Sequence, residues 1–316
     1  MASFVKGSGS NEKVTIDGTK VKDKLTLERF ESHSRVSTLP YHTSDGGFLV
    51  HNNEIHLIGG WQNANTCKMH YKYDGTSWTS VATLPFEFSG GCAVVFNNEI
   101  HILGSGRTNN GTEHYKFTGT SWERVSTLPY KFVNGCAVVF NNELHILGGS
   151  STAYAVGNTT KYHYKFNGNS WTSVSTLPYN FSQSCAVVYE NEIHILGTSH
   201  QSDARRYHYK YNGTSWSKLP NLSVEFSGGC AIVSKDDSIH LFGNHNNMCQ
   251  NMHTSYNSTN DYWSREDILP CMCSGNSVVE FKIDGISKQF CIKGQDGSTL
   301  WDNVLYTFDY AYREVL

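Results

Sequence analysis

A unit of 42 to 50 residues recurs along the chain, and this repetition restricts the possible folds more than any other sequence feature. A repeat of this length with several short strand-like segments is typical of the blades of a β-propeller. The sequence therefore predicts an all-β protein, a six-bladed propeller. Each unit carries a Leu-Pro dipeptide, and five carry a Trp in phase with it. The dipeptides begin at Leu39, Leu84, Leu128, Leu177, Leu219 and Leu269, and the tryptophans are Trp78, Trp122, Trp171, Trp216 and Trp263.

The second unit shows why four strands are expected in each repeat. Its first segment is apolar and β-branched, as in a strand buried on both faces. Asn97 and Asn98 follow it and favour a tight turn, because Asn tolerates positive φ. The third segment alternates, as a half-buried strand does. The predicted strands are residues 91–96, 99–103, 114–117 and 122–125.

These motifs resemble the kelch repeat over residues 39–316. The matching features are the Gly59-Gly60 and Gly148-Gly149 doublets, a third-strand aromatic such as Tyr115, and the Trp about seven residues later. The resemblance implies a six-bladed kelch-type β-propeller with a short N-terminal extension. Some units depart from the pattern. They keep a single Gly, the usual second-strand aromatic is His, and Tyr312 is the nearest equivalent of the missing sixth outer-strand Trp.

The two ends of the chain offer two ways to close the ring. Residues 35–40 repeat residues 124–129, so the N-terminal copy resembles an outer strand without a blade of its own. We predict that it pairs with the sixth unit; the alternative is that residues 313–316 fill this position. The expected domains are an N-terminal arm or attachment segment at residues 1–33 and the propeller at residues 34–316.

Charge and hydropathy restrict the partners. The formal net charge is −3 and no run of like charges occurs, so we expect no nucleic-acid partner. No apolar run approaches the roughly 18 residues of a membrane span, so we expect no membrane insertion. Residues 1–11 are small and polar and lack the apolar core of a signal peptide. We therefore expect synthesis in a cytosol.

Cysteine and histidine repeat with the blades, which favours structural roles. Four of nine cysteines occupy one repeat position and resemble small buried hydrophobes rather than a disulfide framework. Cys271 and Cys273 lack a second pair at zinc spacing. Histidines recur on second strands and near third strands, a blade apart, which favours packing over metal binding. No cofactor or metal site is expected. The repeated cysteines are Cys92, Cys136, Cys185 and Cys230, and the repeated histidines are His56, His101, His145, His194, His240, His70, His114, His163, His208 and His253.

The two faces of the propeller differ in sequence. One face carries the tight turns, which repeat and are explained by turn geometry. The other carries the loops after the second strands and between blades, which vary, and variable loops on a regular scaffold favour ligand binding. Inter-blade aromatics either contact a ligand or fill the gaps between blades. The candidate binding residues on this loop face are Trp61, Phe86, Arg107, Tyr130, Tyr154, Tyr179, Arg205, His245 and Trp301.

The repeats, the polar loops and the short leader resemble kelch-like proteins of bacteriophages. This resemblance implies a non-catalytic binding module, a virion component of the tail or tail fibre. Its partners would be a host-surface glycan or another virion protein, and it would be found in the virion.

Two alternatives stay open. The first is an intracellular kelch adaptor for protein–protein interactions. The second is a carbohydrate-active, epimerase-like enzyme, for which Glu87 and Glu225 occupy equivalent positions in opposite blades.

Overall fold

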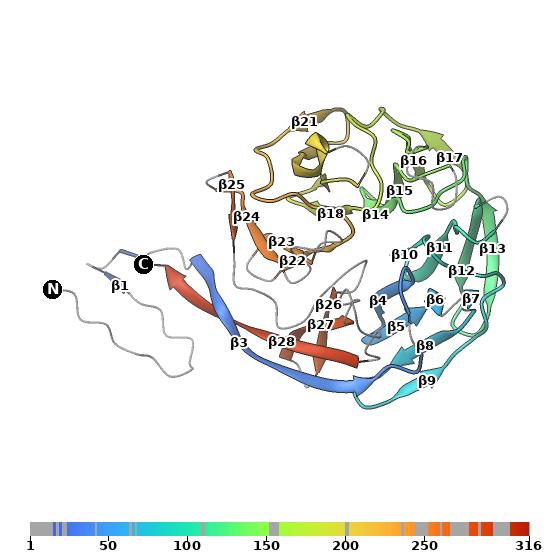
Figure 1. The fold of residues 1–316 in the computed structure, drawn as a ribbon, viewed down its shortest axis with the longest axis horizontal. Coiled ribbons are helices and arrows are strands. Elements are labelled where there is room, and N and C mark those ends of the chain that lie inside the picture. Colours follow the sequence, from blue (N-terminus) through green and yellow to red (C-terminus); the bar gives the residue numbers. More distant parts are fainter. Residues whose placement is uncertain are drawn as a thin grey trace.

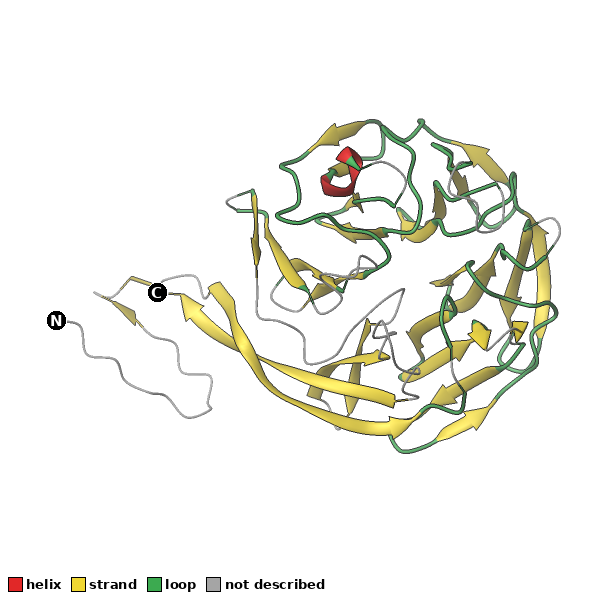
Figure 2. Cartoon of the chain, in the orientation of Figure 1, coloured by secondary structure: helices red, strands yellow, loops and turns green. Residues whose placement is uncertain are grey.

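The fold is that of a computed structural model, in which every strand belongs to a small antiparallel sheet. The structure describes residues 15–16, 19–20, 24–41, 43–62, 65–66, 68–108, 111–151, 158–199, 202–234, 237–243, 252–259, 261–265, 278–283, 286–292 and 304–315. Within these ranges six sheets have four strands each, and two have two strands. The one described helix is the short 3-10 segment η1 (Asp203–Arg206), drawn in red in Figure 2.

The sheets follow the chain order, with each strand pairing with the next. The two-stranded sheets are β1 (Thr15–Ile16) with β2 (Thr19–Lys20), and β6 (Trp61–Gln62) with β7 (Asn65–Thr66). The first three four-stranded sheets, from inner to outer strand, are β4 (Gly47–His51), β5 (Glu54–Ile58), β8 (His70–Tyr73) and β9 (Trp78–Ser80); β10 (Cys92–Phe96), β11 (Glu99–Leu103), β12 (Glu113–Phe117) and β13 (Trp122–Thr127); and β14 (Cys136–Phe140), β15 (Glu143–Leu147), β16 (His163–Phe166) and β17 (Trp171–Ser173).

The other three sheets follow the same plan, although the last takes its outer strand from the beginning of the chain. They are β18 (Cys185–Tyr189), β19 (Glu192–Leu196), β20 (His208–Tyr211) and β21 (Trp216–Lys218); β22 (Cys230–Ser234), β23 (Ser238–Phe242), β24 (His253–Asn257) and β25 (Tyr262–Arg265); and β26 (Val278–Ile283), β27 (Ile286–Ile292), β28 (Val304–Val315) and β3 (Lys24–Thr38). We name each sheet after its innermost strand.

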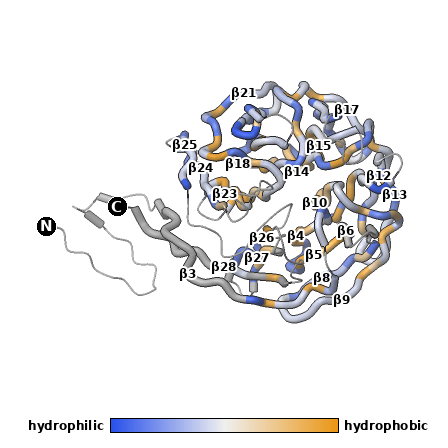
Figure 3. The backbone as a smooth tube through the Cα atoms, in the orientation of Figure 1, coloured by the Kyte–Doolittle hydropathy of each residue, from blue (hydrophilic) through white to orange (hydrophobic). Residues whose placement is uncertain are grey.

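The sheets surround a common axis. The inner strands contact one another in the order β4, β10, β14, β18, β22, β26 and back to β4, and Figure 1 shows the resulting ring. Hydrophobic residues gather on its inner strands (Figure 3). The second strands are the most buried, because each lies between two strands of its own sheet and two neighbouring sheets. The expected all-β propeller is confirmed.

The closure predicted from the repeat at residues 35–40 is confirmed. β3 pairs antiparallel with β28, from Thr38 opposite Val304 to Lys24 opposite Val315, and the two strands run side by side in Figure 1. Residues 313–315 belong to the third strand of this sheet and do not fill the outer position. The equivalence proposed for Tyr312 is therefore wrong, since Tyr312 lies on β28 opposite Leu27.

The Leu-Pro repeat also needs one correction. In three sheets the buried Leu follows the outer-strand Trp by six residues, as Leu84 follows Trp78, and its N–H bonds to the segment before the third strand. In the β18 sheet the residue six after Trp216 is Leu222. Leu222 donates the same hydrogen bond, to the Arg206 carbonyl at 2.8 Å, and is 1% exposed. Leu219-Pro220 therefore lies three residues out of phase, and Leu222 fills the core position.

Candidate functional site

On the turn face, polar groups of the turns and strands already bond to one another. Asn97 and Asn98 have positive φ, as do their counterparts in neighbouring sheets. In the outer turn of the β4 sheet the Asp74 carboxylate accepts the N–H groups of Thr76 and Ser77. Half-exposed ion pairs join the second and third strands of four sheets, at 2.6–2.9 Å. These pairs are Lys72–Glu54, Lys116–Glu99, Lys165–Glu143 and Lys210–Glu192.

On the loop face, a close approach of the backbone imposes one Gly in each of four sheets. Gly104 has φ of +67°, and a Cβ there would lie 2.0 Å from the Phe132 carbonyl oxygen. The residue after this Gly is less restricted. It is a second Gly in two sheets, while Ser105 donates its hydroxyl to the Glu87 carbonyl at 2.7 Å. This difference explains why the Gly doublet is incomplete in the β10 sheet.

Two of the predicted binding residues, Tyr130 and Tyr179, support the loops from their buried side. Their hydroxyls donate to the carbonyls of Gly148 at 2.8 Å and Gly197 at 2.9 Å. Tyr179 is 3% exposed. Burial raises the pKa of both phenols well above the usual value, so both stay protonated donors. The second aromatic of each inter-blade pair is fully buried, which confirms that it fills the gap between sheets: Phe88, Phe132, Phe181 and Phe226.

The other predicted residues are scattered over the loop face. Phe86 is half-buried, with its ring centroid 5.5 Å from that of Tyr115. Arg107 is half-buried, and its backbone N–H donates to Ser105. Arg205, in η1, forms a 3.3 Å ion pair with Glu225. Trp61 begins β6, and only its backbone is described. Three predicted residues lie outside the described part of the chain: Tyr154, His245 and Trp301.

One variable position was missed by the sequence analysis. It directly precedes the third-strand histidine, and its carbonyl accepts the N–H of the second-strand Gly in five sheets, at 2.8–2.9 Å. The backbone at this position is therefore fixed, while the side chain changes from sheet to sheet. Two of its occupants are among the most exposed large hydrophobic side chains, 43% for Met69 and 49% for Tyr162. The five residues are Met69, Glu113, Tyr162, Tyr207 and Met252, and of these Met252 is buried, with 4% exposed.

Around the axis, neighbouring sheets are joined by a chain of backbone hydrogen bonds. The N–H of Gly90 donates to Asp45, that of Asn134 to Gly90, that of Gln183 to Asn134, and that of Gly228 to Gln183, at 2.6–2.8 Å. All five residues have φ between 47° and 68°. A left-handed conformation at this point is therefore part of how successive sheets are joined.

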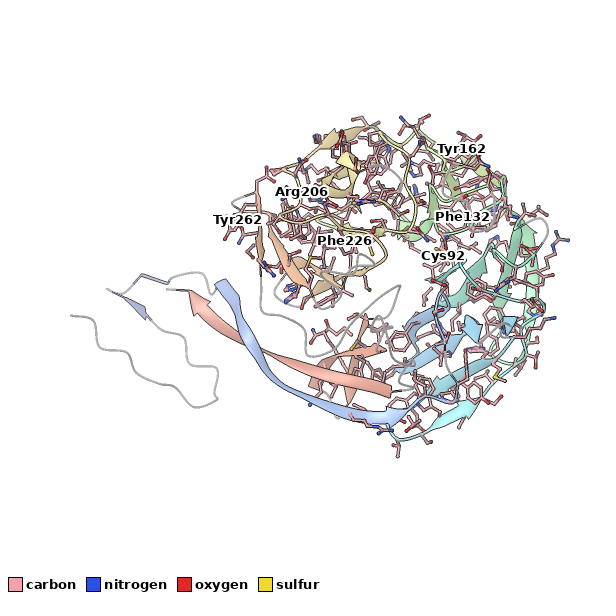
Figure 4. All side chains as sticks on the ribbon, viewed as in Figure 1. Cys92, Phe132, Tyr162, Arg206, Phe226 and Tyr262 are labelled. Carbon is pink, nitrogen blue, oxygen red and sulfur yellow. The ribbon has the colours of Figure 1, made fainter. Side chains whose placement is uncertain are left out.

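Below this chain lie the repeated cysteines. The thiols of Cys92, Cys136 and Cys185 donate to carbonyls of the next sheet at 2.8–3.0 Å. With neighbouring alanines they line a cavity of about 60 Å³ on the axis, and Figure 4 labels Cys92 there. Burial raises the pKa of Cys92 to about 12. The expectation of buried cysteines without disulfides is confirmed for these residues and Cys230; Cys271 and Cys273 lie outside the described ranges.

The repeated histidines form a packing layer. In five sheets the second-strand and third-strand histidines bond to each other, Nδ1 to Nε2, at 2.7–2.9 Å. In four of them the third-strand histidine also contacts a third-strand aromatic and the Trp of the next sheet, with ring centroids 4.9–5.7 Å apart. The predicted packing role of these histidines is confirmed.

The hydrogen bonds of one pair fix its tautomer. Trp263 donates its Nε1–H to His208 Nδ1 at 3.2 Å. Nδ1 of neutral His208 is then the acceptor, so the proton is on Nε2 and is donated to His194 Nδ1 at 2.8 Å. Both rings are neutral, since burial lowers the pKa of His194 to about 4 and holds that of His208 well below its usual value.

The described ranges contain no group of three or more His, Cys, Asp or Glu side chains arranged to hold a metal ion. No helix in them is long and apolar enough to cross a membrane.

Comparison with known proteins supports the fold. No protein-family model and no curated protein matches the chain. Among solved structures, the structure of YjhT is similar, with a TM-score of 0.69 and 14% sequence identity. The alignment covers 89% of this chain and 97% of that chain. At this identity the likeness shows the propeller fold alone. It is one of 399 similar chains, and a fold this widespread does not indicate one activity.

Proposed function

We propose that the chain is a six-bladed kelch-type propeller that acts as a non-catalytic binding module of a phage virion, in the tail or a tail fibre. Its loop face would recognise a host-surface glycan. The phage assignment is supported by the resemblance of the repeats and polar loops to kelch-like phage proteins. In this proposal residues 1–33 attach the module, although residues 24–33 also pair with β28.

The contrast between the two faces carries the proposal. On the turn face, four sheets repeat one ion pair with the same residue types. On the loop face, one fixed backbone position carries Met, Glu, Tyr, Tyr and Met in five successive sheets. Packing does not demand this variety in the first four of these sheets, because the side chain there is exposed or half-exposed, whereas Met252 is buried in the core. Variation on a rigid scaffold is typical of recognition surfaces.

The chemistry of the loop face favours a glycan over another virion protein. Beside Met69 and Phe86, its large described side chains near solvent are tyrosines, which combine an apolar ring with a hydroxyl. Saccharides present C–H faces beside hydroxyls and so match both parts of a tyrosine. Protein-binding sites centre instead on well-packed anchors that become fully buried in the complex.

Two measurements test the proposal together. Mass spectrometry of purified phage particles should detect the chain, and the purified chain should bind bacterial polysaccharides on a glycan array. Detection in particles without glycan binding would favour another virion protein as the partner. Absence from particles would contradict the virion role. Turnover of a sugar that Glu87→Gln abolishes would contradict the non-catalytic assignment.

A further inference from the structure

Two neighbouring sheets present tyrosine clusters at the outer end of the loop face. In the β14 sheet, Tyr162 lies with its ring centroid 5.0 Å from Tyr130 and 6.2 Å from Tyr164. The interplanar angles are 65° and 80°, so the rings meet edge to face. Tyr130 is tied to the Gly148 carbonyl. Tyr162 is therefore held against a fixed base while about half of its surface, 49%, stays open.

The β18 sheet repeats this arrangement. Tyr207 lies with its ring centroid 5.5 Å from Tyr179 and 6.0 Å from Tyr209. Tyr179 is tied to the Gly197 carbonyl, as Tyr130 is to Gly148. The Lys218 ammonium lies 4.5 Å from the centre of the Tyr207 ring. This cation–π contact holds a triple hydrogen-bond donor at the edge of the cluster.

The hydroxyls of the outer rings are available. Among the described residues, no hydrogen-bond partner is found for the hydroxyls of Tyr162, Tyr164, Tyr207 and Tyr209. The hydroxyls of Tyr130 and Tyr179 instead donate to backbone carbonyls. Each cluster thus has an inner ring that is fully committed to the fold and outer rings with free polar groups. This division is expected of a preformed binding platform and is unnecessary for packing alone.

The other three sheets with the same backbone position differ in their side chains. The occupant is Met69 in the β4 sheet, Glu113 in the β10 sheet and the buried Met252 in the β22 sheet. None of the three offers a tyrosine at this position. The tyrosine pair is therefore confined to the adjacent β14 and β18 sheets, and Tyr162 lies at the outer rim of the ring in Figure 4.

We propose that the Tyr162 and Tyr207 clusters are two carbohydrate subsites that bind two sugar units of one glycan. The C–H face of a pyranose would stack on each exposed ring, and the phenols and the Lys218 ammonium would bond its hydroxyls. This inference rests on the proposed glycan recognition and names where it occurs. Because both subsites would hold the same chain, the second would bind at a high effective concentration.

Binding of the intact chain to an array of bacterial polysaccharides tests this assignment. Loss of one stacking ring in Tyr162→Ala or Tyr207→Ala should weaken binding about tenfold, and the double variant should lose more than either alone. Tyr162→Phe keeps the ring and should weaken binding by less than Tyr162→Ala. Tyr262→Ala is the matched control, because Tyr262 is 47% exposed but lies on the outer strand β25, outside both clusters. It should leave binding unchanged.

Any other result contradicts the proposed subsites. The results also distinguish failure of the subsites alone from failure of glycan recognition as a whole. If the unaltered chain binds a glycan and both alanine variants bind it equally well, the subsites are wrong while glycan recognition stands. If the unaltered chain binds no glycan but is found in particles, the subsites and the glycan partner are both wrong while the virion role stands. Equal losses in Tyr262→Ala would show a nonspecific effect and also reject the subsites. Unchanged melting curves confirm that each variant is folded.

Discussion

The five sheets that carry a histidine pair differ from the β26 sheet in what holds them to the ring. In the five, a buried imidazole–imidazole hydrogen bond joins the second and third strands. The strands β26, β27 and β28 contain no histidine. This sheet is instead completed by β3, which pairs with β28 at twelve positions. The ring thus combines a repeated polar core with one long strand pairing.

The comparison shows two ways of stabilising a sheet of the same size. A buried neutral pair depends on proton concentration, because charging it without water is costly. A backbone pairing is insensitive to pH but depends on a distant part of the chain. The following predictions separate the two, from the largest expected effect to the smallest.

Acid should unfold the ring through the five histidine-bearing sheets. Burial lowers the pKa of His56, His101 and His145 from 6.5 to about 4, and that of His70 and His114 to about 3. Depressed values stabilise the fold fully above the unfolded pKa, and this contribution falls as pH drops from 6.5 towards 4. Each of these histidines then lowers the free energy of unfolding by about 1.4 kcal/mol per pH unit. Circular dichroism between pH 7.5 and 3.5 should show cooperative unfolding.

Salt provides the control for this experiment. Unfolding driven by general charge repulsion is weakened by 0.5 M NaCl, because salt screens charges at the surface. Protonation of buried histidines should keep the midpoint nearly unchanged. A chain that retains its native near-ultraviolet spectrum at pH 3.5 would contradict the role given to the histidine layer.

Removal of residues 1–38 should produce the next largest effect. It deletes β3 and leaves the edge of β28 unpaired, so we expect a fall in melting temperature of about 10 °C or more. A truncation of residues 1–23 is the matched control, because it keeps β3 intact. Scanning calorimetry of both variants decides the question, and equal melting temperatures would show that β3 does not hold the β26 sheet.

A single histidine substitution should cost less than the loss of β3. His163→Phe leaves the bonded nitrogen of His145 buried without its partner, which costs about 1–3 kcal/mol of unfolding free energy. The double variant His145→Leu with His163→Phe removes both polar groups and should lose less than the sum of the single variants. Urea denaturation at pH 7.5 measures the three values. Additive losses would mean that the two rings are not coupled.

The smallest effect is expected on the turn face. Lys165→Ala removes the 2.8 Å ion pair with Glu143, whose side chains are 38% and 26% exposed. Partly exposed pairs contribute about 0–1 kcal/mol. Urea denaturation should therefore place this variant close to the unaltered chain. A loss as large as that of His163→Phe would show that the turn face also stabilises the sheets.

The repeat predicted the fold well because its repeated residues occupy positions with fixed backbone requirements. Asn97 and Asn98 sit in positive φ, and Gly104 is required by the close Phe132 carbonyl. The Leu-Pro dipeptide failed once, at Leu219, because a dipeptide motif is not itself a core position. The structure places a different leucine, Leu222, six residues after Trp216, which is the spacing found in three other sheets.

The candidate site was predicted less well, because the sequence does not distinguish loop aromatics that support the fold from those that face solvent. Tyr130 and Tyr179 spend their hydroxyls on Gly148 and Gly197 and serve as supports. Tyr162 was missed because it directly precedes a strand that begins with a buried histidine. The sequence nevertheless contains a signal for it. The residue before each third-strand histidine changes between repeats while the histidine does not.

The pairing of β3 with β28 has a consequence for the newly made chain. Thr38 and Val304 are direct partners, so β3 leaves the ribosome long before its partner exists. At about 5–20 residues per second, the delay is roughly 15–50 s. During this time the central sheets can form in sequence, but the first strand must wait with both edges open. Ring closure is then the last and most non-local event of biogenesis, and pairing of the waiting strand with a neighbouring polypeptide is the error that competes with it.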